Sequence, residues 1–176
     1  MNRLEHLQLL ATYNRWMNEK LYCAAGSLPA DALTADRQAF FGSILGTLNH
    51  LLVADLIWLR RFADHPASHE IRAVLDIPAP RALDEVLLAD FVELEQQRVW
   101  LDERICGWIA SLREEDLDTT LAYSSMKGVP ARKNLHSLLA HLFNHQTHHR
   151  GQVTALLAQA GVDYGTTDLL LLVSDD

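Results

Sequence analysis

The sequence predicts an all-α protein whose long helices form a four-helix bundle with long crossover connections. Glycine and proline divide the chain into four long segments, and none shows the two-residue alternation typical of a half-buried strand. Each long helix needs a partner for its apolar face, and a bundle of four satisfies this need. The 176 residues can bury roughly 70% of the surface of the unfolded chain. We therefore expect residues 1–176 to form a single domain.

The first predicted helix spans roughly residues 3–25 and ends at Gly26, a residue that often terminates helices. Its apolar side chains recur at helical spacing and should face the core. They are Leu7, Leu10, Met17 and Leu21. Asn14 falls in the centre of this stripe, and a buried amide requires hydrogen-bond partners.

The second predicted helix begins after Ser43, which is a suitable N-cap, and extends to Phe62. Its sequence, ILGTLNHLLVADLIWLRRF, is apolar on nearly every side. A helix without a polar face must be surrounded by other elements. We therefore expect it to be the most buried of the four.

The third predicted helix covers about 81–110 and the fourth about 133–160. Asn134 is a possible N-cap of the fourth helix, and Gly161 is its expected end. The sequence that follows, DYGTTDLLLLV, should pack back onto the helices or onto a partner chain.

The connections near 27–42, 64–80 and 111–132 are too long for tight helical hairpins. A simple up-and-down order of the helices is therefore not required. The last connection is compatible with a short β-hairpin, because Tyr123 and Val129 flank the dipeptide Lys127-Gly128.

The composition is that of an ordinary globular protein, with 49% hydrophobic and 22% charged residues. The net charge of -8 disfavours a general nucleic-acid binder, because 15 basic residues spread along the chain cannot form a phosphate-binding surface. The same charge disfavours binding to an anionic membrane.

The sequence indicates a cytoplasmic protein. Glu5 interrupts the apolar stretch that a secretion signal would need, and no apolar run approaches the ~18 residues of a membrane span. Cys23 and Cys106 lie far apart in helix-like segments without CxxC spacing, so we expect two buried free thiols.

Residues 141–153, HLFNHQTHHRGQV, contain four of the nine histidines. On a helical wheel His145 and His149 fall in the centre of the apolar stripe of the fourth helix, whereas His141 and His148 fall on its edge. Histidines four residues apart have Cβ atoms ~5–6 Å apart on one face, so both imidazoles can reach the same metal ion. The alternative is that each histidine is a core residue bonded to a neighbouring polar group.

A catalytic metal site needs at least a third protein ligand. His50 and Asp55 of the second helix are the candidates, but they stand ~140° apart on the wheel and cannot both face one ion. Because that helix is apolar all round, the wheel does not choose between them. The Asn14 amide could orient a ligand histidine or bind a metal-bound water, or it could form a purely structural hydrogen bond between helices.

Three stretches of the sequence resemble the DinB family of metal-binding four-helix bundle proteins, which includes YfiT-like members. They are YNRWMNEKL at 13–21, GSILGTLNHLLVADLIWLRRF at 42–62 and HLFNHQTHHRGQV at 141–153. The resemblance implies that His50, His145 and His149 hold a divalent ion. It also implies a homodimer, and a pair of first and second helices that a long crossover links to the other two.

Three imidazoles with open coordination positions suit zinc or nickel, and also iron or manganese. Such an ion can activate water or hold a thiol as thiolate. Some members of the family are similar to thiol S-transferases that use a low-molecular-weight thiol as co-substrate. We therefore expect a metal-dependent transferase or hydrolase that acts on a small electrophilic molecule.

No general acid or base is evident in the sequence. Asp55 and His148 could support the ligand histidines by hydrogen bonding, although Asp55 could equally pair with Arg60 or Arg61. The alternative function is a non-catalytic, metal-binding dimer that mediates stress-related interactions.

Overall fold

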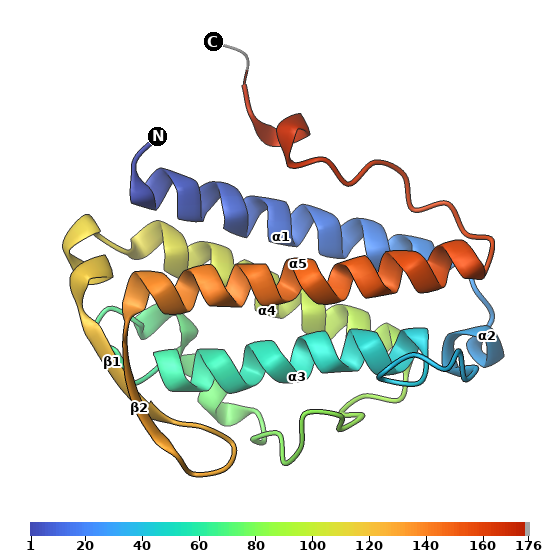
Figure 1. Cartoon of the computed structure of the whole chain (residues 1–176), viewed down its shortest axis with the longest axis horizontal. Coiled ribbons are helices and arrows are strands. Elements are labelled where there is room, and N and C mark those ends of the chain that lie inside the picture. The colour runs from blue at the N-terminus through green and yellow to red at the C-terminus, as the bar shows by residue number, and fades with distance from the viewer. Residues whose placement is uncertain (175–176) are drawn as a thin grey trace.

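The computed structural model describes residues 1–174 and is mostly helical, so the predicted all-α class is confirmed (Figure 1). The long helices are α1 (Arg3–Ala25), α3 (Ile44–Phe62), α4 (Phe91–Ser111) and α5 (Leu135–Gln159). The shorter elements of the described chain are α2 (Ala30–Thr34), η1 (His69–Asp76), η2 (Glu114–Asp118), η3 (Leu169–Leu172) and the strands β1 (Thr120–Ser124) and β2 (Pro130–Asn134).

The long helices share one apolar core. α1 packs against α4 and α5, and α3 packs against α5. Each helix contributes fully buried side chains, for example Leu21, Leu52, Trp108 and Leu139. In α3, 15 of 19 residues are buried, compared with 10 of 25 in α5. The prediction that the second long helix is the most buried is therefore confirmed.

The caps that the sequence predicts begin two of these helices. The Ser43 side chain accepts a hydrogen bond from the backbone N–H of Gly46, and the Asn134 side chain accepts one from Ser137. Each bond satisfies one of the amide groups that the first turn of a helix leaves free. These caps fix the starts of α3 and α5, the two helices that carry the histidines of interest.

The first two long helices lie diagonally rather than side by side. Figure 1 shows α1 and α3 at opposite edges of the helical layer, with α4 and α5 between them. The connection 26–43, which includes the short helix α2, carries the chain across this distance. The pairing of first and second helices that the resemblance implies is therefore not found.

The third long helix is shorter than predicted. The sequence predicts helix from residue 81, but α4 begins at Phe91. Asp90 is its N-cap, because the Asp90 side chain accepts a hydrogen bond from the N–H of Glu93. The preceding backbone is bound to α3 instead: Leu88 N–H donates to the Asn49 side chain, and the Asn49 amide donates to the Leu88 carbonyl. Residues 81–90 therefore run over α3 as a connecting loop.

The predicted hairpin is confirmed as the antiparallel pair β1 and β2, in which Tyr123 lies opposite Ala131. Gly128 has a φ of 75° at the tip, a conformation that glycine adopts without steric cost. Val129 belongs to this tip and not to a strand, because its carbonyl accepts the hydrogen bond from Ser125 N–H that closes the turn.

Both cysteines are free, as predicted, but their predicted burial is wrong: Cys23 is exposed and Cys106 only partly buried.

The chain after α5 crosses α1, where the Tyr13 hydroxyl donates to the Thr167 carbonyl at 2.7 Å. The C-terminal stretch thus packs back onto the helices, as expected. Within residues 1–174, each helix is too short or too polar to cross a membrane.

Candidate metal centre

The structure brings together His50 of α3 with His145 and His149 of α5. One nitrogen of each ring lies within 4.8 Å of the corresponding nitrogens of the other two. α3 and α5 run side by side (Figure 1), and His50 is 4% exposed while the other two rings are partly buried. Of the two candidates on α3, the structure therefore selects His50 as the side chain that faces the α5 histidines.

Hydrogen bonds at the outer ring nitrogens orient two of these imidazoles. His50 Nδ1 lies 2.8 Å from the Leu83 carbonyl, and His149 Nδ1 lies 2.7 Å from Gln152 Oε1. An oxygen of this kind only accepts, so each Nδ1 carries the proton of the neutral ring. The Nε2 atoms of both rings are then left with free lone pairs. Such outer partners are typical of metal-binding histidines.

The two free Nε2 atoms point at each other. The distance from His50 Nε2 to His149 Nε2 is 3.2 Å. With both protons on Nδ1, this contact brings two lone pairs together, which is unfavourable unless a cation or proton lies between them. Two nitrogen ligands ~2.0–2.1 Å from one tetrahedral ion are roughly 3.3 Å apart. The geometry of the pair therefore fits a shared metal ion.

His145 completes the cluster as a neutral ring. Its Nδ1 is buried and has no hydrogen-bond partner among residues 1–174. Burial, together with the neighbouring histidines, lowers the pKa of His145 to about 3. Burial also lowers the pKa of His50 and of His149. All three imidazoles are thus neutral at pH 7, which is the protonation state that binds a metal.

Phe41 forms a wall of the site that sequence reasoning missed. Its ring stacks on His50 with centroids 3.8 Å apart and meets the edge of His149 at 5.6 Å. The turn that presents it includes Gly42, with a φ of 73°. The Leu83 carbonyl was also missed, because the sequence predicts helix from residue 81, and a carbonyl within a helix would bond to its own backbone. Gln152, three residues after His149 on the same helix, could have been found from its spacing.

His148 is exposed, and its ring meets the edge of His149 with centroids 4.8 Å apart. It therefore contacts a candidate ligand, but no hydrogen bond joins the two rings in the described chain. His141, which the wheel places on the same edge of the stripe, is also exposed and lies against Trp58. The predicted edge positions of His141 and His148 are confirmed.

Asn14 and Asp55 are buried, and within residues 1–174 neither forms a hydrogen bond with the three histidines, so their proposed support of the ligands is not found. Asp55 accepts from Arg98 Nη1 at 2.7 Å and from the Gln146 amide, so the alternative pairing with Arg60 or Arg61 is not the one observed either. Asn14 donates to Asp102 at 3.0 Å and accepts from Arg150. The structural alternative for Asn14, a hydrogen bond between helices, is the one observed.

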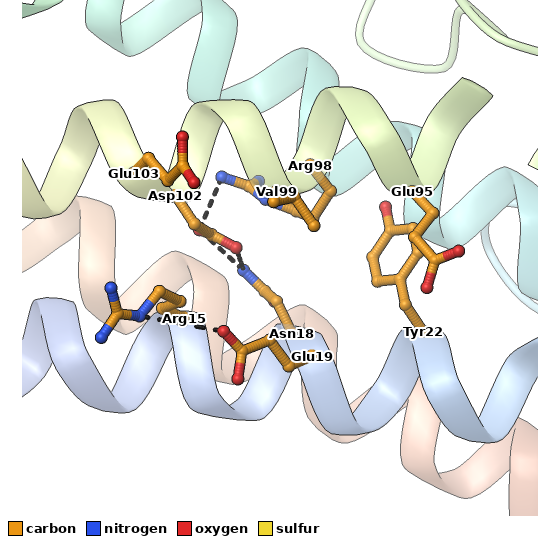
Figure 2. A pocket seen from close by; sticks show the side chains of 9 residues that line it. All are labelled: Arg15, Asn18, Glu19, Tyr22, Glu95, Arg98, Val99, Asp102 and Glu103. Carbon is orange, nitrogen blue, oxygen red and sulfur yellow. Dashed lines mark hydrogen bonds and ion pairs between the residues drawn. The ribbon is translucent and has the colours of Figure 1, made fainter. Parts of the chain in front are cut away.

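These residues belong to a polar network inside the core that connects all four long helices. Figure 2 shows its part between α1 and α4, where Arg98 and Asn18 lie on either side of the Asp102 carboxylate. Asp55, Arg98, Asp102 and Arg150 are each at most 3% exposed. Because two carboxylates face two guanidinium groups, the buried charges balance. The network is a structural feature and contributes no nitrogen atom to the histidine cluster.

The low pKa of His145 predicts a pH-dependent stability of the metal-free protein. In the unfolded chain His145 titrates near its ordinary value of 6.5, but when folded it titrates at about 3. Between these values the unfolded chain binds the extra proton, so the free energy of unfolding falls as the pH falls. From pH 7.5 to 5 we expect His145 to contribute a loss of about 1–2 kcal/mol. Urea unfolding at both pH values measures this loss. In His145→Gln the free energy of unfolding should fall by about 1–2 kcal/mol less between the two pH values. An equal fall in both proteins would contradict the low pKa of His145.

Comparison with known proteins identifies the family of the chain. The chain matches the model of the DinB family over residues 1–174. It is also similar to Protein DinB of Bacillus subtilis (strain 168), with 28% identity over 159 residues, which cover 90% of this chain and 88% of that protein. No solved structure matches the chain significantly. Since the family match spans nearly the whole sequence, and the resemblance drawn from its motifs is thereby confirmed, the chain belongs to the DinB family.

Proposed function

We propose that this protein is a divalent-metal-dependent enzyme, of the thiol S-transferase or hydrolase type, that acts on a small electrophilic molecule. The observation that carries the proposal is the 3.2 Å distance between the Nε2 atoms of His50 and His149, whose lone pairs face each other. A core histidine that serves only packing would be expected to hydrogen-bond through its free nitrogen. Here the outer partners instead aim both nitrogens at one point.

The number of ligands supports a catalytic rather than a closed structural ion. The cluster contains three nitrogen donors and, among residues 1–174, no further cysteine or carboxylate close enough to join it. Structural zinc sites are almost always completed by a fourth protein ligand, whereas catalytic sites leave a position open. Three neutral nitrogens suit zinc or nickel in a purified sample, and iron or manganese are also compatible.

The chemistry requires little more from the chain than orientation. When bound, the ion would lower the pKa of a water or thiol at its open position, which prepares a nucleophile at neutral pH. Leu83 and Gln152 hold the His50 and His149 rings in the required tautomer. Phe41 covers one face of His50 and reduces access of bulk water. The two free cysteines are compatible with the reducing cytoplasm in which we place the protein.

A second candidate is a non-catalytic dimer that binds metal and mediates interactions. The exposed side chains of Leu170 and Leu171, which are 77% and 62% accessible, favour it. Exposed apolar side chains of this size, close to α1, could meet a second copy of the chain. The second candidate predicts a dimer that catalyses no reaction. The enzyme predicts turnover, whether the protein is a monomer or a dimer.

Metal content and turnover together decide between the two. The protein is purified without a polyhistidine tag, its bound metal is measured, and it is incubated with low-molecular-weight thiols and the electrophile monochlorobimane. We expect a stoichiometric ion and thiol conjugation that a chelator abolishes. Conjugation that survives removal of the metal would contradict the proposal. A parallel incubation with ester substrates tests for hydrolysis. If the protein contains a stoichiometric ion but neither conjugates a thiol nor hydrolyses an ester, the result favours the non-catalytic dimer.

A further inference from the structure

A pocket of about 310 Å³ opens beside His145, between α3, α5 and the tip of the β1–β2 hairpin. Its walls are mainly apolar and include Ala54, Trp58 and Met126. Leu83, whose carbonyl orients His50, lines the same pocket. The volume is that of a small-molecule site, at the lower end of the ~300–1,000 Å³ range. It therefore extends the metal site into a space for the rest of a ligand.

The pocket carries positive charge without negative charge. Arg61 and Lys127 line it, and none of its lining residues is acidic. This is unexpected in a chain with 23 acidic and 15 basic residues. An anion in this pocket would meet two cations and no repelling carboxylate in the wall.

Arg61 has no anionic partner in the part of the chain that the structure describes. Its guanidinium lies over the rings of Trp58, at 4.6 Å, and Tyr123, at 5.1 Å. The neighbouring Arg60 differs, because it donates to the carbonyls of Val74 and Ile77. Partial burial lowers the pKa of Arg61, so its charge is in an unfavourable environment that an anion would improve. The two aromatic rings hold the guanidinium at the pocket with its N–H groups free.

We infer that this pocket binds a small organic carboxylate, with its apolar body against Trp58 and Met126 and its carboxylate at Arg61. Guanidinium groups bind carboxylates through paired, charge-assisted hydrogen bonds. Ala54 and Arg61, which both line the pocket, are seven positions apart on α3, so the pocket extends about 10 Å along the helix. The end of this molecule opposite the carboxylate would be its reacting end, and this assignment rests on the proposed metal-dependent function. Binding of the carboxylate to Arg61 does not depend on the proposed function.

The test uses two probes of similar shape, 4-phenylbutyrate and the uncharged 4-phenyl-1-butanol, and the metal-free full-length protein. Calorimetry measures the dissociation constant of each. We expect the wild-type protein to bind the acid about ten-fold more tightly than the alcohol, because only the acid forms charge-assisted bonds. Arg61→Gln should remove this preference, and Arg61→Lys should retain part of it. Lys127→Gln, at the exposed hairpin tip, should weaken binding of the acid by about two- to three-fold.

The matched control is Arg72→Gln, which also removes one positive charge but lies exposed on η1, outside the pocket. It should retain the full preference for the acid. Equal binding of acid and alcohol by the wild-type protein would overturn the inference, as would a preference that survives in Arg61→Gln. Should Arg61→Gln fail to fold, Arg61→Lys and Lys127→Gln decide by the same comparison. Metal content, measured on the same preparations before the metal is removed, reports on the proposed function, so failure of one does not imply failure of the other.

Discussion

Replacing His145 with alanine should reduce the affinity for zinc by more than roughly 100-fold. Loss of a hydrogen-bond partner of a ligand can cost up to about 100-fold, and this substitution removes a ligand itself. His145 supplies one of the three nitrogens of the cluster. Two imidazoles would remain, and they would have to share the ion with additional water. Titration of the metal-free protein with zinc, in competition with a chromophoric chelator, measures the change.

The same substitution should leave the helical fold intact. His145 has a buried nitrogen without a partner in the described chain, so its removal also takes away an unfavourable group. Far-UV circular dichroism should therefore show nearly unchanged helicity. Broad loss of helix on substitution would indicate instead that the ion is structural and that the open-site interpretation is wrong.

The control for this experiment is His141→Ala. His141 is on the same face of α5, one turn before His145, and the two rings have centroids 6.0 Å apart. It does not belong to the group of nitrogens that converge. Zinc affinity should therefore change by less than about three-fold, since only a distant packing contact is removed. A loss as large as that of His145→Ala would place His141 in the site.

Two of the three histidines in this cluster could be predicted from local spacing, and the third could not. The four-residue separation of His145 and His149 on an amphipathic helix already places both rings on one face. His50 and Asp55 could not be ranked, because α3 is buried on nearly all sides and both residues point into the molecule. What separates them is a partner 43 residues away: Asp55 meets Arg98 on α4. A wheel drawn for one helix contains no information about such a contact.

The start of α4 shows the same limit in the fold. Residues 81–90 include good helix formers, so the sequence predicts helix there. Tertiary contacts override this preference, because Asn49 binds the backbone of Leu88 and His50 binds the carbonyl of Leu83. The four long segments themselves were predictable, since glycine and proline delimit them and the predicted caps Ser43 and Asn134 mark the starts of two. The loop that supplies the Leu83 carbonyl to His50 was not.

Replacing Arg98 with methionine should lower the free energy of unfolding by about 3–5 kcal/mol, the largest effect on stability that we expect from one substitution. Arg98 lies 2.7 Å from Asp55 and 2.8 Å from Asp102, and all three are buried. Without its guanidinium, two carboxylates remain in the core with only Arg150 nearby. Urea unfolding at pH 7.5 measures the loss. Arg104→Met on the same helix, where Arg104 lies over the ring of Trp100, is the control and should cost only about 1 kcal/mol.

The Arg98 penalty should also depend on pH in a direction that identifies its cause. Burial raises the pKa of the Asp55 carboxyl, and Arg98 opposes that rise. In Arg98→Met the opposition is gone, so the folded protein binds a proton at Asp55 that the unfolded chain releases near pH 4. The stability of the variant relative to the wild type should therefore improve as the pH falls from 8 towards 5, because a protonated Asp55 needs no cation. Asp55→Asn in the Arg98→Met background should recover part of the loss at pH 8 by the same reasoning. A penalty independent of pH and unchanged by Asp55→Asn would show that Arg98 acts through packing that methionine does not reproduce, and not through its charge.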